Sequence, residues 1–204
     1  GSVVSVTVAS GKTLVFSNCR FVANGSRTGN IEGSSEGISV KCCRFEYCFG
    51  DYRSSAITEH GGNTIAVSDC LFRCISRPSA NGGNVLYGWM GGFTVRNSTF
   101  ERCAQASGES WWYQPTYGGA GAIHFSERNK MADFYDCAFS NNYCATSYAY
   151  GPTFFCTPMR MKRCVFSYNC AECSPVQGSV YALISANTVE GLASRSFEGC
   201  AFEG

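Results

Sequence analysis

Short runs in which apolar and polar residues alternate recur along the whole chain. In residues 37–40 and 64–67, for example, every second residue is isoleucine or valine. Such alternation, with many β-branched and aromatic residues, is typical of half-buried β-strands. Because no segment shows a sustained 3.6-residue period, we expect few helices and an all-β fold.

A tripeptide with cysteine first and phenylalanine third follows these runs at regular intervals. Four of the six intervals are between 24 and 28 residues long, and the two longer ones can hold insertions. Ser98 takes the place of cysteine in one copy. The seven copies have their phenylalanines at Phe21, Phe45, Phe72, Phe100, Phe139, Phe166 and Phe202.

The residue three positions before each phenylalanine predicts a corner of the chain. It is asparagine, aspartate or glycine in five of the seven copies, and these residue types tolerate a left-handed backbone. The cysteine and phenylalanine that follow are two residues apart and therefore share one face of a strand. We expect three short strands, joined by such corners, to form one coil.

A single coil cannot bury its inner face, whereas stacked coils bury one another's. The sequence therefore predicts a right-handed parallel β-helix, a solenoid of about seven coils, as one segment over residues 1–204. The tripeptide cysteines and phenylalanines would form inward ladders. Because the pattern is still repeating at its end, we expect the chain to be a fragment of a longer protein.

Composition and charge exclude several classes of function. The net charge of +1 and the lack of a basic run argue against nucleic-acid binding. No apolar stretch approaches the ~18–20 residues of a spanning helix, so we expect no direct membrane insertion. Among the 14 cysteines, Cys70 with Cys74 and Cys170 with Cys173 have the spacing of zinc ligands, but the two pairs lie far apart and the chain has only two histidines. We expect no metal and no cofactor.

The repeat resembles that of the chlamydial polymorphic membrane protein passengers, which carry many copies of F-x-x-N and G-G-A-[ILV]. Residues 21–24, 139–142 and 166–169 match the first motif, and Cys48 and Cys103 replace its asparagine in two further copies. Residues 118–123 match the second motif loosely, with one additional glycine. The resemblance, shared with protist surface proteins, implies a right-handed β-helix at the cell surface or outside the cell.

The cysteines fall into two groups. Those of the tripeptide are expected to be buried, packed thiols, because free cysteine behaves as a small apolar residue. The others are better disulfide candidates, although their connectivity cannot be read from the sequence. Cys170 and Cys173 are the expected local pair, and the further candidates are Cys48, Cys74, Cys103, Cys144 and Cys156.

Two insertions rich in aromatic residues are the candidate binding sites. They cover residues 107–119 and 143–151. Exposed aromatic side chains dominate many binding surfaces, although these could instead fold back over the sheet. The candidate binding residues are Trp111, Trp112, Tyr113, Tyr117, Tyr148 and Tyr150. Asn24 and Asn97 begin N-x-[ST] sequons and are candidate glycosylation sites.

These features favour an extracellular structural or adhesive β-helix that presents loops to glycans or cell-surface proteins. Flanking coils or further copies of the chain are possible partners, and a subunit of an extracellular filament is one alternative. Another alternative is a polysaccharide lyase or glycoside hydrolase, because the broader β-helix group includes such enzymes. The chain has only four aspartates: Asp51, Asp69, Asp133 and Asp136. We expect the last two to face opposite sides of a strand and the two corner aspartates, Asp69 and Asp136, to accept backbone hydrogen bonds.

Overall fold

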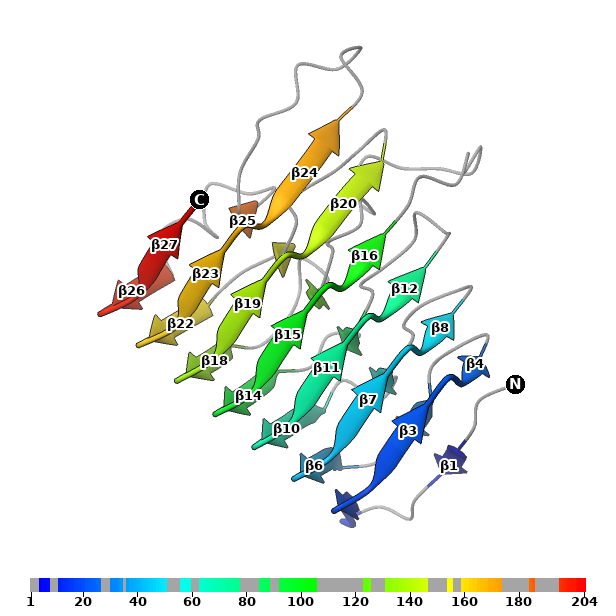
Figure 1. The fold of residues 1–204 in the computed structure, drawn as a ribbon. Helices are drawn as coiled ribbons and strands as arrows, with labels where there is room; N and C mark the ends of the chain where they lie inside the picture. The colour runs from blue at the N-terminus through cyan, green and yellow to red at the C-terminus, as the bar shows by residue number, and fades with distance from the viewer. Residues whose placement is uncertain are drawn as a thin grey trace.

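The chain winds into a parallel β-helix, and no helix occurs among the described residues. The computed structural model describes residues 4–7, 11–26, 30–34, 36–50, 56–59, 63–77, 85–88, 92–105, 123–125, 131–146, 154–155, 159–173, 184–185 and 195–204. Each strand pairs in parallel with the equivalent strands of the coils before and after it (Figure 1). The predicted fold class is confirmed.

Four sheets run along the axis of the β-helix, and we name them A to D in the order in which the chain passes through them. Sheets A, B and C have seven strands each and sheet D has six. The strands of sheet A are β1 (Val4–Thr7), β5 (Ile31–Ser34), β9 (Ile57–Glu59), β13 (Leu86–Gly88), β17 (Ile123–Phe125), β21 (Phe154–Phe155) and β25 (Ile184–Ser185). Those of sheet B are β2 (Leu14–Ser17), β6 (Gly37–Lys41), β10 (Thr64–Ser68), β14 (Phe93–Arg96), β18 (Ala132–Tyr135), β22 (Met159–Lys162) and β26 (Arg195–Glu198).

Sheets C and D face the viewer in Figure 1. Sheet C contains β3 (Arg20–Val22), β7 (Arg44–Glu46), β11 (Leu71–Arg73), β15 (Thr99–Glu101), β19 (Ala138–Ser140), β23 (Val165–Ser167) and β27 (Ala201–Glu203). Sheet D contains β4 (Gly25–Ser26), β8 (Phe49–Gly50), β12 (Ser76–Arg77), β16 (Ala104–Gln105), β20 (Tyr143–Thr146) and β24 (Cys170–Cys173). Sheet D is a correction, since the sequence predicts only three strands per coil.

Sharp corners separate sheet B from sheet C and sheet C from sheet D. The first corner is the predicted one, and all seven of its residues have positive φ, from 46° at Asn97 to 60° at Gly199. The second corner lies two residues after each phenylalanine and also has positive φ in every copy, as at Ala23 and Tyr47. Two left-handed residues, three positions before and two positions after each phenylalanine, thus set the cross-section of the coil.

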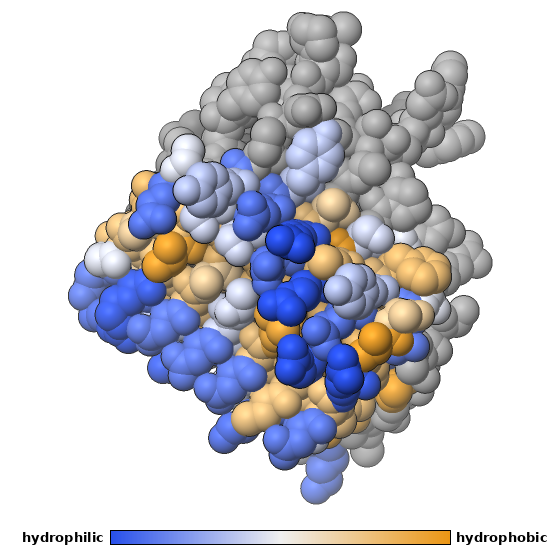
Figure 2. Space-filling model, viewed as in Figure 1, coloured by the Kyte–Doolittle hydropathy of each residue, from blue (hydrophilic) through white to orange (hydrophobic). Residues whose placement is uncertain are grey.

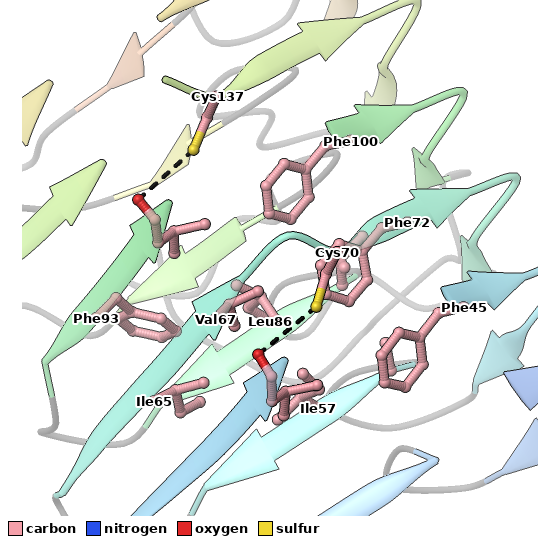
Figure 3. Close-up of a cluster of buried hydrophobic side chains, with 14 of the residues drawn as sticks. Phe45, Ile57, Ile65, Val67, Cys70, Phe72, Leu86, Phe93, Phe100 and Cys137 are labelled. Atoms are coloured by element: carbon pink, nitrogen blue, oxygen red, sulfur yellow. Dashed lines mark hydrogen bonds between the residues drawn. The ribbon is translucent and has the colours of Figure 1, made fainter. Parts of the chain in front are cut away.

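The phenylalanines of sheet C form a continuous stack through the core. Register pairs each ring with the next, as in Phe45 with Phe72, and five of the seven are almost fully buried. Successive ring centroids are 4.7–5.0 Å apart, and the ring planes differ by 5–11°. Figure 3 shows this row facing aliphatic side chains of sheets A and B, such as Ile57 and Ile65.

Candidate binding surface

The predicted aromatic site lies outside the described residues. This applies to Trp111, Trp112, Tyr113, Tyr117, Tyr148 and Tyr150. The strands on either side nevertheless define where their segments attach. Residues 106–122 join β16 to β17, and residues 147–153 join β20 to β21, so both connect sheet D to sheet A.

The two aromatic segments begin at neighbouring strands. β16 pairs with β20, and Gln105, the last residue of β16, lies in register with Cys144. The starting points of the two segments are far apart in the sequence but lie on paired strands of successive coils. The sequence alone did not predict this. One boundary is corrected, because residues 143–146 form strand β20 rather than part of an insertion.

The tripeptide cysteines line the first corner and connect successive coils. The backbone N–H of Cys43 donates to Sγ of Cys70 at 3.4 Å, and that of Cys70 donates to Oγ of Ser98 at 3.1 Å. The Cys70 thiol in turn donates to the carbonyl oxygen of Ser68 at 3.0 Å and lies 3.6 Å from that of Val40. The side chain at this position therefore forms hydrogen bonds with backbone groups that have no partner within the sheets at the corner.

Burial makes Cys43 and Cys70 poor nucleophiles. The tripeptide cysteines of the inner coils are buried, as the sequence predicts. Cys19 and Cys200, in the first and last coils, are half-buried. Burial raises the pKa of Cys70 to about 11, and it raises the pKa of Cys43 as well. Because only the thiolate is reactive, Cys43 and Cys70 act as packing groups rather than reactive ones. Cys164 differs, since its hydrogen bond with the Cys137 thiol lowers its pKa.

The disulfide predictions are wrong where the described residues test them. Cys48, Cys74 and Cys103 are free thiols. Cys48 and Cys103 occupy an inward position just after the second corner, where burial raises the pKa of both.

The expected local pair is excluded by its backbone. Cys170 and Cys173 are the two ends of strand β24. An extended strand separates such residues by about 10 Å, beyond the about 4.4–6.8 Å between Cα atoms that a disulfide accepts. Cys156 and the side chain of Cys144 lie outside the described residues.

The F-x-x-N motif has a structural explanation at the second corner. Its asparagine lies inward there and bridges coils in the same way as the cysteines of the first corner. Oδ1 of Asn142 accepts the backbone N–H of Cys103 at 3.0 Å, and its Nδ2 donates to the carbonyl oxygen of Phe100 at 3.1 Å. Asn169 makes the equivalent bonds to Asn142 and to Phe139 one coil later.

The two sequon asparagines occupy different corners. Asn97 is exposed at the first corner, where its Nδ2 donates to Oδ1 of Asp69 at 3.3 Å. Asn24 is half-buried just after the second corner, at the position of Asn142 and Asn169 in later coils. Asn97 is therefore the more accessible of the two candidate glycosylation sites.

The corner aspartates bind side chains rather than the backbone, and this corrects the prediction for Asp69 and Asp136. Asp136 accepts two hydrogen bonds from Arg163, both 2.6 Å long, and Asp133 accepts two from Arg160 at 2.6 and 2.8 Å. Because Asp136 lies in the corner and not in the strand, both carboxylates reach the outer surface. The prediction that they face opposite sides is wrong.

The ion pair with Arg163 affects whether Asp136 could act as a catalytic acid. Arg163 holds the pKa of Asp136 below its usual value of 3.8, through its hydrogen bonds above all. A glycosidase needs one carboxyl group with a raised pKa to act as the general acid. Asp136 is shifted in the opposite direction and does not suit that role.

An open concavity of about 530 Å³ lies at the first corner, between sheets B and C. Its exposed lining includes Cys42, Arg44, Asp69 and Asn97. Across the part of the chain that the structure describes, no three histidine, cysteine or acidic side chains form a group that could hold a metal ion. Within the same ranges, no helix has the length and apolar character needed to cross a membrane.

Comparison with known proteins gives no match to a protein-family model, a curated protein or a solved structure.

Proposed function

We propose that the chain is a structural and adhesive segment of an extracellular surface protein, a β-helical rod that presents loops to glycan or protein partners. The observation that carries this proposal is the origin of the two aromatic segments at neighbouring strands of sheet D. The first segment contains four of the candidate aromatic residues and the second contains two. Such a concentration of tryptophan and tyrosine is typical of binding surfaces.

The core supports a role in rigid presentation. The phenylalanine stack and the hydrogen-bonded corner ladders repeat from coil to coil, so the scaffold stays regular while its connections vary in length. In stacked-coil proteins, insertions of this kind form the binding face.

A glycan-binding assay with the double variant Trp111→Ala, Trp112→Ala tests the proposal. We expect glycan binding to be abolished and the thermal midpoint to stay nearly unchanged. Tyr168→Ala is the matched control, because Tyr168 is 69 % exposed at the second corner and should leave binding intact. A large loss of thermal stability would instead indicate that the two tryptophans belong to the core.

The enzymatic alternative remains a polysaccharide lyase or glycoside hydrolase. Its support is that Asp133 and Asp136 both reach the outer surface beside arginines. Depolymerisation of a polysaccharide, removed by Asp133→Asn, would favour this alternative over adhesion.

The filament alternative draws on the last strands of sheets B and C. Phe197 and Phe202 continue the inward rows and are 43 % and 54 % exposed. A further coil, from this protein or from another copy, would cover them. Concentration-dependent association in sedimentation, abolished by Phe202→Glu, would support a filament.

A further inference from the structure

Four arginines emerge from four successive coils on the outer surface around sheet C. Arg20 lies on β3, Arg44 on β7 and Arg73 on β11, while Arg102 follows β15 at the second corner. Their side chains are between 38 and 66 % exposed. Figure 2 shows strongly hydrophilic side chains gathered on this face over the first coils. We call these four residues, with Glu46 and Glu101, the arginine face.

The two glutamates hold the arginines in place. Glu46, whose side chain is only 6 % exposed, accepts from Nε of Arg20 at 3.1 Å and from Nη2 of Arg44 at 3.4 Å. Glu101 accepts from Nε of Arg73 at 3.0 Å and lies 3.8 Å from Nε of Arg102. Each carboxylate thus orients two guanidinium groups before any ligand arrives, which lowers the entropic cost of binding.

The arginine face keeps a positive charge and donors for a ligand. Four arginines against two glutamates leave a net charge of +2, whereas the whole chain has +1. The glutamate contacts engage one nitrogen of each guanidinium, and each guanidinium carries five N–H donors. The remaining donors belong to exposed side chains and suit the planar oxygens of carboxylate or sulfate groups.

We propose that the arginine face binds a linear acidic polysaccharide that crosses the outer surface of sheet C obliquely. Arg20 and Arg44 are in register on neighbouring strands, whereas Arg73 lies two residues further along its strand and Arg102 at the following corner. Because the strands are about 4.8 Å apart, an extended polymer that carries carboxylate or sulfate groups meets these arginines in turn. Sugar hydroxyl groups donate to the carboxylate of Glu101, whose side chain is 23 % exposed, whereas Glu46 is buried beneath its two arginines. Tyr47, which is 58 % exposed at the adjoining corner, offers a ring face for a sugar.

The interleaved glutamates favour this ligand over a nucleic acid. Duplex DNA carries about one negative charge per 1.7 Å of its axis, and a protein binds it by neutralising many phosphates. On the arginine face, a carboxylate lies between each pair of arginines and repels closely spaced phosphates. A polysaccharide carries hydroxyls between its acidic groups, so fewer of its charges meet these carboxylates.

The arginine face is built from residues of sheet C and the second corner, whereas the aromatic segments begin after strands of sheet D. The inference goes beyond the proposed function and shares with it only the glycan as ligand. The two can fail separately, because the tryptophan variants test one surface and arginine variants test the other.

The test measures binding of the purified chain to immobilised dextran sulfate, polygalacturonate, neutral dextran and duplex DNA. The key variant is Arg20→Gln with Arg102→Gln, which leaves each glutamate one arginine partner. The matched control is Arg160→Gln with Arg163→Gln, which removes the same charge from the outer surface of sheet B and the first corner. Arg20→Lys with Arg102→Lys keeps the charge and provides a second variant if the glutamine variant does not fold.

We expect binding to at least one acidic polymer, weakening with salt, and none to neutral dextran. The glutamine variant should bind about tenfold or more weakly, the lysine variant less weakly than that, and the control within about twofold of the unmodified chain. Dextran sulfate and polygalacturonate distinguish a sulfate from a carboxylate ligand. An equal loss in the control, equal binding of neutral dextran, tighter binding of DNA, or no binding of either acidic polymer would overturn the proposal.

Discussion

At the scale of single residues, the cysteine of the tripeptide serves as a small hydrogen-bonding group. Ser98 shows this directly, because its Oγ accepts the N–H of Cys70 at 3.1 Å and donates to the carbonyl oxygen of Arg96 at 2.7 Å. The thiols of Cys43 and Cys70 make the same pair of contacts over longer distances. The position requires one donor and one acceptor in little space, which cysteine and serine both provide.

The neighbours Cys42 and Cys43 should differ sharply in reactivity. Cys42 is exposed at the corner, whereas Cys43 is buried and burial raises its pKa. With a limiting amount of a thiol reagent at neutral pH, mass spectrometry should find Cys42 labelled first and Cys43 only after unfolding. Labelling of both at similar rates in the folded protein would contradict the packing described here.

Truncation of the phenylalanine stack should cost more in the middle than at its end. Phe72→Ala removes a fully buried ring between two others, and we expect a loss of about 3–5 kcal/mol in the free energy of unfolding. Phe202→Ala is the matched control, since its ring is 54 % exposed and contacts one neighbour in the stack. Urea unfolding measures both, and equal losses would contradict a continuous buried stack.

At the scale of elements, the corners determine how strands become coils. Both corners place a residue in the left-handed region, which costs a non-glycine residue about 1–2 kcal/mol. The backbone there is tied to the next coil, as in the bond of 3.0 Å from the N–H of Cys42 to the carbonyl oxygen of Ser68. Hydrogen bonds between coils therefore hold a conformation that most residues avoid.

Substitutions at Cys42 test the strain of the first corner. Its φ is 53° and its side chain is exposed. Cys42→Gly should raise the free energy of unfolding by up to about 1 kcal/mol, and Cys42→Val should lower it, because β-branched residues tolerate this region least. Thermal unfolding of both variants measures the difference. A valine variant as stable as the glycine variant would be evidence against a left-handed corner.

The ion pair of Asp136 and Arg163 should stabilise the fold only above acidic pH. Because Arg163 lowers the pKa of Asp136 in the folded protein, the contribution is present above the usual value of 3.8 and is lost as the pH falls through the lowered pKa. Asp136→Asn should therefore lower the urea midpoint at about pH 7 and have little effect at about pH 2. If the urea midpoints of the variant and the unmodified chain differed by the same amount at both pH values, the stabilising ion pair of Asp136 with Arg163 would be contradicted.

The sequence predicted the first corner because asparagine, aspartate and glycine are common there. It did not predict the second corner, where Ala23, Tyr47 and Arg102 have no preference for positive φ. Sheet D was missed for a related reason, since a strand such as β12 has two residues and shows no alternation. The available signal was the asparagine or cysteine three positions after five of the phenylalanines.

The arginine face was beyond sequence reasoning. Glu101 and Arg73 are 28 residues apart, and only the register of β11 with β15 brings them together. Insertions of unequal length shift this spacing from coil to coil. Pairing across coils therefore becomes visible only once the register is known.

At the scale of the whole molecule, different sides of one rod carry different surfaces. The phenylalanine stack and the corner ladders form the interior, the aromatic segments leave from sheet D, and the arginine face lies on and beside sheet C. This division lets surface residues change without disturbing the core. The design fits a protein that presents binding surfaces.

The most direct test of this account measures binding and turnover together. The purified chain is incubated with a panel of neutral and acidic polysaccharides, and both retention on each glycan and release of new chain ends are recorded. The account predicts saturable binding of at least one glycan with no depolymerisation. Depolymerisation that a carboxylate substitution removes would contradict it and identify the chain as an enzyme.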